Sequence, residues 1–141
     1  MATVELRFSA LPEHVRTARL VAAAVARRAG VDEAVLDEVR LAVGEACTRA
    51  VGLHQAAAIP APVRVALVEE EKQFSIEVGD EAPRSAPGER VPGAPPGSGE
   101  DLEAEGEDEM GLAVISGLVD DVEVTAGENG GSIRMTWPTT A

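Results

Sequence analysis

Hydrophobic positions near the start of the chain repeat with two different periods. Residues 3–8 alternate between apolar and polar side chains, which is typical of a half-buried strand. Apolar residues then recur at spacings of three and four, as on one face of a helix, in a segment that ends at Gly30 and again from about residue 33 to 53. Pro12 suits the first turn of the first helix, and Asp32 can cap the second. The pattern predicts one strand followed by two amphipathic helices.

The second half of the chain contains four short runs with the composition of strands. Turn-forming sequences join them in pairs, which predicts two hairpins. The strands are expected at residues 63–68, 74–78, 121–125 and 132–137, and a short apolar helix is expected at 111–119. This order of elements predicts an α+β fold, a two-layer sandwich in which helices cover one face of a mixed, mostly antiparallel sheet.

Residues 81–109 differ from the rest of the chain in composition. They hold five of the nine prolines and nine acidic residues against two arginines, a balance of −7 within a net charge of −13. Such a segment buries too little apolar area to offset the entropy of ordering it. We expect an internal acidic, flexible loop, because patterned sequence resumes after it. The whole chain, residues 1–141, is therefore predicted to form a single domain that contains this loop.

Charge and cysteine content exclude several classes of protein. The net charge of −13 argues against a nucleic-acid-binding surface, which needs clustered lysine and arginine. No apolar run approaches the roughly 20 residues that span a bilayer, and the charged start does not resemble a signal peptide. The single cysteine, Cys47, excludes an internal disulfide, and His14 and His54 lack the arrangement of a metal site. These features predict a cytoplasmic protein without membrane or direct nucleic-acid contacts.

Three local sequences carry candidate chemistry: Ala18-Arg-Leu20, Leu41-Ala-Val-Gly-Glu-Ala-Cys-Thr-Arg-Ala50, and Ile76-Glu-Val-Gly-Asp80. Together with the order of elements, they resemble the anti-sigma factor and serine-kinase branch of the histidine-kinase-like (Bergerat) ATPase family. The resemblance covers nearly the whole chain outside the acidic loop. It implies the fold of that family, serine/threonine kinase activity, ATP with Mg²⁺ as cofactors, and a sigma factor and a STAS-type antagonist as partners.

The resemblance makes Glu45 the candidate catalytic base that activates a hydroxyl group or water. Four residues later, on the same helix face, the family has an asparagine that holds Mg²⁺ with the triphosphate, whereas this chain has Arg49. A guanidinium group has only donors and cannot ligate a cation. Arg49 is expected to pair with Glu45 and so make it a poorer base. The alternative is that Arg49 contacts a phosphate directly, without metal.

Asp80 matches the aspartate that accepts a hydrogen bond from adenine in the family, although a strand-ending aspartate also fits a plain turn. The family's glycines after it are replaced by Glu81-Ala-Pro83. Gly111 and Leu112 match the end of the family's Gly-x-Gly-Leu motif before the lid helix, but an acidic residue replaces its first glycine. The acidic loop therefore takes the ATP-lid position and surrounds the phosphate site with like charge. ATP and Mg²⁺ binding is expected to be weak or lost.

The first helix and the first strand carry the candidate protein contacts. In the family, an arginine of this helix touches the sigma factor and the competing antagonist. Arg19 lies in that register, and Arg16 precedes it by about one turn. The plain alternative is that both are solvated arginines. Residues 3–8 would form an edge strand with unpaired backbone groups, through which family members often pair, so a homodimer is compatible with the sequence.

These observations leave three functional interpretations. The favoured one is an anti-sigma-type regulatory protein that binds a sigma factor, a STAS-type antagonist or both, and is inactive as an enzyme. The alternative is an active ATP-dependent serine kinase that phosphorylates the antagonist, which the retained Glu45 and Asp80 favour. The third is an interaction module in which the acidic loop docks onto a basic surface of a partner.

Overall fold

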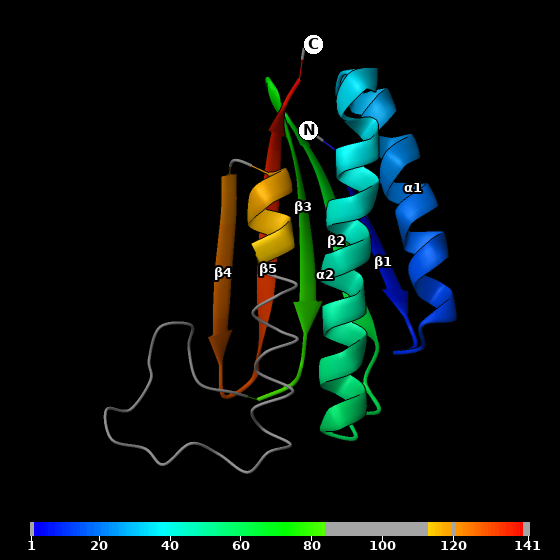
Figure 1. Cartoon of the computed structure of the whole chain (residues 1–141), viewed down its shortest axis with the longest axis vertical. Helices are drawn as coiled ribbons and strands as arrows, with labels where there is room; N and C mark the ends of the chain where they lie inside the picture. The colour runs from blue at the N-terminus through cyan, green and yellow to red at the C-terminus, as the bar shows by residue number, and fades with distance from the viewer. Residues whose placement is uncertain (1, 84–112, 120, 140–141) are drawn as a thin grey trace.

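The computed structural model describes residues 2–83, 113–119 and 121–139, and it shows a layer of helices on one face of a sheet (Figure 1). The described strands are arranged in the order β1-β2-β3-β5-β4, and every neighbouring pair is antiparallel. This arrangement confirms the predicted α+β fold with helices on one face of the sheet. The strands are β1 (Ala2–Phe8), β2 (Val63–Glu70), β3 (Gln73–Asp80), β4 (Asp121–Gly127) and β5 (Gly130–Pro138).

The two long helices begin and end close to the expected positions. α1 (Glu13–Ala29) follows Pro12 and ends at Gly30, whose φ of 101° lies in the left-handed region that glycine tolerates. The Asp32 carboxylate accepts a hydrogen bond from the Ala34 amide at 3.0 Å and caps the 3₁₀ turn η1 (Glu33–Val35). α2 (Leu36–Ala56) follows at once. A short helix over residues 113–118 lies within the predicted range 111–119.

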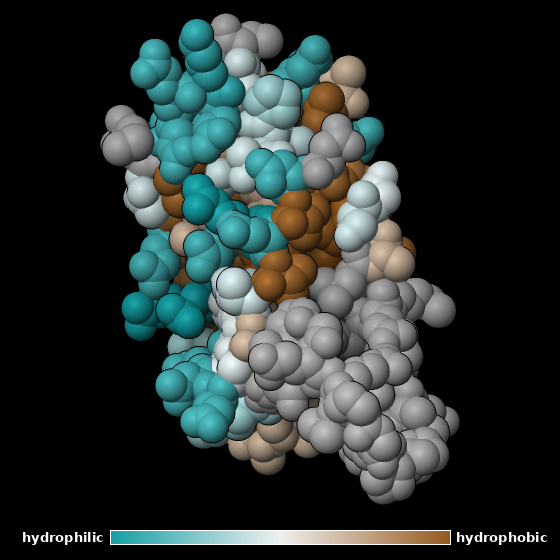
Figure 2. All heavy atoms as spheres, turned by 90° about the vertical axis from the view of Figure 1, so that its left-hand side faces the viewer, coloured by the Kyte–Doolittle hydropathy of each residue, from teal (hydrophilic) through white to brown (hydrophobic). Residues whose placement is uncertain are grey.

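The core is aliphatic and lies between the two layers. The helices contribute mainly small residues, which lets them pack closely together and onto the sheet, and the strands contribute larger side chains. The opposite face of the sheet carries polar pairs such as Ser75 and Thr136, whose hydroxyl oxygens lie 3.0 Å apart. Figure 2 shows hydrophilic side chains along the left of the view and hydrophobic ones gathered near its middle. The fully buried core residues include Ala22, Ala26, Val39, Ala42, Val43, Leu67, Phe74, Ile76, Ile133 and Met135.

Cys47 lies inside this core, on the apolar face of α2, and is fully buried. Burial raises the pKa of its thiol to about 12, because the thiolate would lose its hydration. The thiolate is the reactive form of cysteine. Cys47 is therefore expected to be inert toward thiol reagents in the folded protein and to react only on unfolding.

The raised pKa also predicts a loss of stability at alkaline pH. In the unfolded chain the thiol ionises above about pH 8.5, whereas in the folded protein it stays protonated up to its higher pKa. The stabilisation is thus fully present below about pH 8.5 and declines by about 1.4 kcal/mol per pH unit above it. Urea unfolding of the wild type and of Cys47→Ala from pH 7.5 to 10.5 measures this slope. Parallel curves for the two proteins would contradict the prediction.

Two sequence expectations concern residues that the structure does not describe. Residues 84–109 of the predicted acidic loop lie outside the described residues, as do Gly111 and Leu112. Within the part that is described, no helix is both long enough and apolar enough to cross a membrane.

Candidate functional site

Asp80 is the last residue of β3 and is buried, with 2% of its surface exposed. Its carboxylate Oδ1 accepts a hydrogen bond from the Ala82 amide at 3.0 Å. On the neighbouring strand, Asp80 pairs with Gly131 of β5. Gly130 has a φ of 109°, and a Cβ atom added there would lie 2.1 Å from the Asp80 carbonyl oxygen. The turn between β4 and β5 therefore packs directly against the backbone of Asp80.

His54, near the end of α2, forms hydrogen bonds to the backbone next to Asp80. The side chain is fully buried, its Nδ1 lies 2.9 Å from the Ala61 carbonyl oxygen, and its Nε2 lies 2.9 Å from the Glu81 amide nitrogen. An amide N–H can only donate, so Nε2 accepts and the ring proton sits on Nδ1, which donates to Ala61. His54 thus connects α2, the segment before β2 and the residue that follows Asp80.

Sequence analysis did not assign this role to His54. A signal was present, because His54 continues the apolar spacing of Cys47 and Ala50 on the buried face of α2. A polar ring at such a position needs hydrogen-bond partners. The spacing could not identify them, since both come from outside the helix.

Glu45 and Arg49 lie one turn apart on α2, and both are partly exposed. The ion pair that we expected between them is absent from the pairs formed among the described residues, so that expectation is wrong. An i,i+4 pair on a helix surface gains only about 0.3–0.5 kcal/mol, so other contacts easily replace it. Ion pairs between two described residues include Glu5–Arg7, Arg27–Glu33, Arg28–Glu69, Asp37–Arg40 and Glu70–Arg134.

The described candidate nucleotide residues lie on α2 and at the end of the central strand β3. Glu45 precedes His54 by nine positions, which corresponds to about 13 Å along a helix axis. Because His54 bonds to Glu81, Asp80 belongs to the His54 end of α2 and Glu45 lies farther toward its start. The structure thus describes three of the five candidate catalytic and cofactor residues: Glu45, Arg49 and Asp80.

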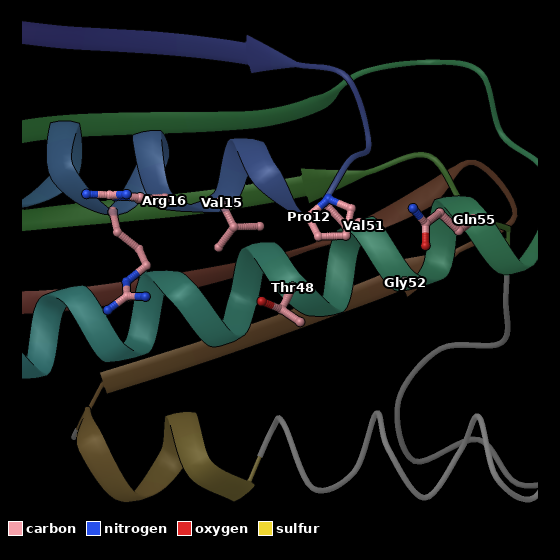
Figure 3. A pocket seen from close by; sticks show the side chains of 8 residues that line it. Pro12, Val15, Arg16, Thr48, Val51, Gly52 and Gln55 are labelled. Atoms are coloured by element: carbon pink, nitrogen blue, oxygen red, sulfur yellow. The ribbon is translucent and has the colours of Figure 1, made fainter.

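Arg16 and Arg19, the candidate partner contacts, line one groove between α1 and α2. In Figure 3, the Arg16 and Val15 side chains extend from α1, and those of Thr48 and Gln55 from α2. The groove has a volume of about 330 Å³ and is lined by Pro12, Val15, Arg16, Arg19, Thr48, Val51, Gly52 and Gln55. Sequence analysis identified its two arginines but not the α2 wall.

The side chain of Arg19 packs against Gly44 of α2. A Cβ atom at Gly44 would lie 3.0 Å from the Arg19 Cδ atom, so the aliphatic stem of Arg19 crosses directly over the glycine. Gly52, two turns later on α2, has nothing within 4 Å of the corresponding position. Arg19 therefore packs against α2 at Gly44, whereas the space above Gly52 is unfilled.

Comparison with known proteins identifies the family. Residues 8–137 match the model of the histidine kinase-like ATPase domain, and the chain belongs to that family. No curated protein matches its sequence. Among solved structures, the RsbU and RsbW domains of a Mycobacterium tuberculosis protein are similar, with a TM-score of 0.69 and 16% identity over 99% of this chain and 32% of that chain. The chain spans about a third of the length of that protein, and at this identity the likeness concerns the fold.

Proposed function

We propose that this protein is an anti-sigma-type regulator that binds a sigma factor, a STAS-type antagonist or both, and that its ATP binding is weak or lost. The observation that carries the proposal is the convergence of Arg16 and Arg19 on one groove of a histidine kinase-like ATPase domain. The similarity to a structure containing an RsbW domain supports the partner-switching class of regulator.

The groove has the features of a protein contact. Its floor includes Val15 and Val51, and both of its charged lining residues are arginines. Arginine beside apolar surface is a common anchor of protein interfaces. Because Glu45, Arg49 and Asp80 are not among the residues that line the groove, partner binding there does not require the candidate nucleotide residues.

The test is complex formation with the sigma factors and STAS-domain proteins of the source organism, measured by biolayer interferometry. Arg19→Glu is expected to weaken the complex at least tenfold, because a carboxylate replaces the anchoring charge. Arg27→Glu is the matched control, since Arg27 lies on the same helix but outside the groove, in an exposed pair with Glu33 at 3.4 Å. Equal affinities of the wild type and the Arg19→Glu variant would refute Arg19 as the anchor, and no complex with any candidate would refute the proposed function.

The nucleotide part of the proposal rests on Arg49. A donor-only side chain stands where the family ligates Mg²⁺, and phosphoryl transfer needs metal or an equivalent to neutralise developing charge. Nothing among the described residues replaces that ligand: they contain no cluster of three or more histidine, cysteine or acidic side chains that could hold a metal. The residues described thus fit Mg²⁺ poorly.

Isothermal titration with ATP and Mg²⁺ tests this prediction on the wild type and on Arg49→Asn. We expect no measurable binding by the wild type and binding by the variant, because asparagine restores an oxygen ligand. Adding Asp80→Asn to the variant should remove the regained binding if Asp80 contacts the adenine. Tight binding by the wild type would instead favour the alternative function, a serine kinase that uses the retained Glu45 and Asp80.

A further inference from the structure

The groove between α1 and α2 has an asymmetric shape and chemistry. On the α1 side, the exposed residues Arg16 and Arg19 line it. On the α2 side, the lining residues Thr48 and Gly52 are small and one turn apart. Val51 contributes to an apolar floor. A second element can therefore approach α2 closely while its charged groups meet the arginines of α1.

The charge on this face runs against that of the whole protein. The chain has a net charge of −13, yet both charged residues that line the groove are arginines, Arg16 and Arg19. A positive surface within an acidic protein favours acidic partners and disfavours basic ones through long-range electrostatics. The other two arginines of α1, Arg27 and Arg28, do not line the groove and pair with Glu33 and Glu69.

Three exposed leucines lie close in the sequence to residues of the groove or to Gly44. Leu11 precedes the lining residue Pro12 and is 42% exposed. Leu20 follows Arg19 and is 58% exposed, and Leu41, one turn before Gly44, is 51% exposed. The segment of α1 from Pro12 to Arg19 corresponds to about 10 Å, or two helical turns. The complementary ligand has apolar side chains flanking carboxylates over this length.

The backbone chemistry of the walls selects the conformation of that ligand. Both walls are helices, whose amide and carbonyl groups are hydrogen-bonded within each helix. An extended peptide would find no backbone partners along them, whereas a helix satisfies its own backbone groups. Helix-in-groove recognition therefore fits this site better than strand addition.

We propose that the groove between α1 and α2 binds an acidic amphipathic helix of the partner protein. Its apolar side chains contact Val15 and Val51, and its carboxylates pair with Arg16 and Arg19. The inference rests on the proposed function, because it names the kind of partner segment that the same face takes.

A synthetic helical peptide of about 16 residues, with leucines at helical spacing and flanking glutamates, is the probe. Its control has lysine at every glutamate position. Titration of the glutamate peptide into isotopically labelled protein should shift the backbone amide signals of Thr48, Gly52 and Gln55. The affinity derived from these shifts should be at least tenfold higher for the glutamate peptide than for the lysine peptide. Absence of shifts at these residues, or equal binding of the lysine peptide, would overturn the proposal.

Two variants test the geometry. Neither Gly52→Leu nor Gly52→Ala should disturb the fold at the added Cβ atom, because nothing lies within 4 Å of it. Gly52→Leu fills the groove and is expected to lower the affinity for the glutamate peptide at least tenfold. The smaller Gly52→Ala should keep the affinity within about threefold of the wild type. Arg16→Glu combined with Arg19→Glu should reverse the preference toward the lysine peptide. Binding that survives Gly52→Leu, or an unchanged preference in the double variant, would overturn the inference.

The same variants separate this inference from the proposed function. If a sigma factor or STAS protein binds the wild type and Gly52→Leu equally, the groove assignment is wrong and the regulatory function stands. If neither class of protein binds, the proposed function fails, while the peptide titration still decides the groove. A dimer of the chain that dissociates in Gly52→Leu would assign the groove to a second copy and overturn the acidic-helix proposal.

Discussion

Replacing Gly130 with alanine is expected to destabilise the protein by roughly 3 kcal/mol, from a left-handed backbone and steric overlap together. Gly130 has a φ of 109°, which an L side chain rarely adopts. The added Cβ atom would lie 2.1 Å from the Asp80 carbonyl oxygen and 2.7 Å from the Glu81 Cα atom. Both obstacles are backbone atoms, so no side-chain rotation can relieve the overlap.

Gly127→Ala is the matched control for this substitution. Gly127 pairs with Gly130 across the same hairpin, has no positive φ, and has nothing within 4 Å of the added Cβ position. Its unfolding free energy is expected to stay within about 0.5 kcal/mol of the wild type, as at ordinary surface sites. Urea unfolding can be followed by the fluorescence of Trp137, which is buried and is the only tryptophan in a chain without tyrosine. Equal midpoints for the two variants would refute the close packing of Gly130 on Asp80.

The effect of Gly130→Ala should also reach the candidate nucleotide site. Relief of the overlap must move either the turn or the end of β3, and the latter carries Asp80. Amide chemical shifts of Asp80, Glu81 and Ala82 should therefore change in Gly130→Ala and stay in place in Gly127→Ala. The stability of the protein and the position of the candidate adenine contact at the end of β3 are thus expected to depend on the same glycine.

The helices and strands were predictable because their periodicities are local. Alternation over residues 3–8 and helical spacing around Val39 and Val43 depend only on which face each element buries. The short turns also predicted the β2–β3 and β4–β5 hairpins. The pairing of β3 with β5 was not predictable in this way, since residues as far apart as Phe74 and Trp137 meet there.

The candidate sites show the same division between local and non-local information. Glu45, Arg49, Asp80 and Arg19 could be named as candidates because family motifs are local strings of residues. The groove depends on how antiparallel helices pack, which sets Arg19 over Gly44. The sequence places these residues 25 positions apart, and no spacing rule connects them.

The largest effect of a single buried polar group is expected at His54. Replacing it with leucine keeps an apolar side chain in the core but leaves the Ala61 carbonyl and the Glu81 amide without the partners that lie at 2.9 Å. Each group stranded in this way costs about 1–3 kcal/mol. His54→Leu is therefore expected to lower the unfolding free energy by roughly 2–6 kcal/mol, a large part of the stability of a small domain.

Two further substitutions divide this effect between the hydrogen bonds. Glutamine can place its Oε1 near the position of Nε2 and accept from Glu81, whereas asparagine can place its Nδ2 near Nδ1 and donate to Ala61. Each should lose less stability than His54→Leu. Protection of the Glu81 amide from hydrogen exchange should persist in His54→Gln and fall in His54→Asn, because only the former keeps an acceptor for that amide. Nitrogen-15 shifts of the wild-type ring should report a protonated Nδ1 and an unprotonated Nε2. The opposite tautomer, or the same Glu81 protection in both variants, would contradict the proposed bridge between α2 and the residue after Asp80.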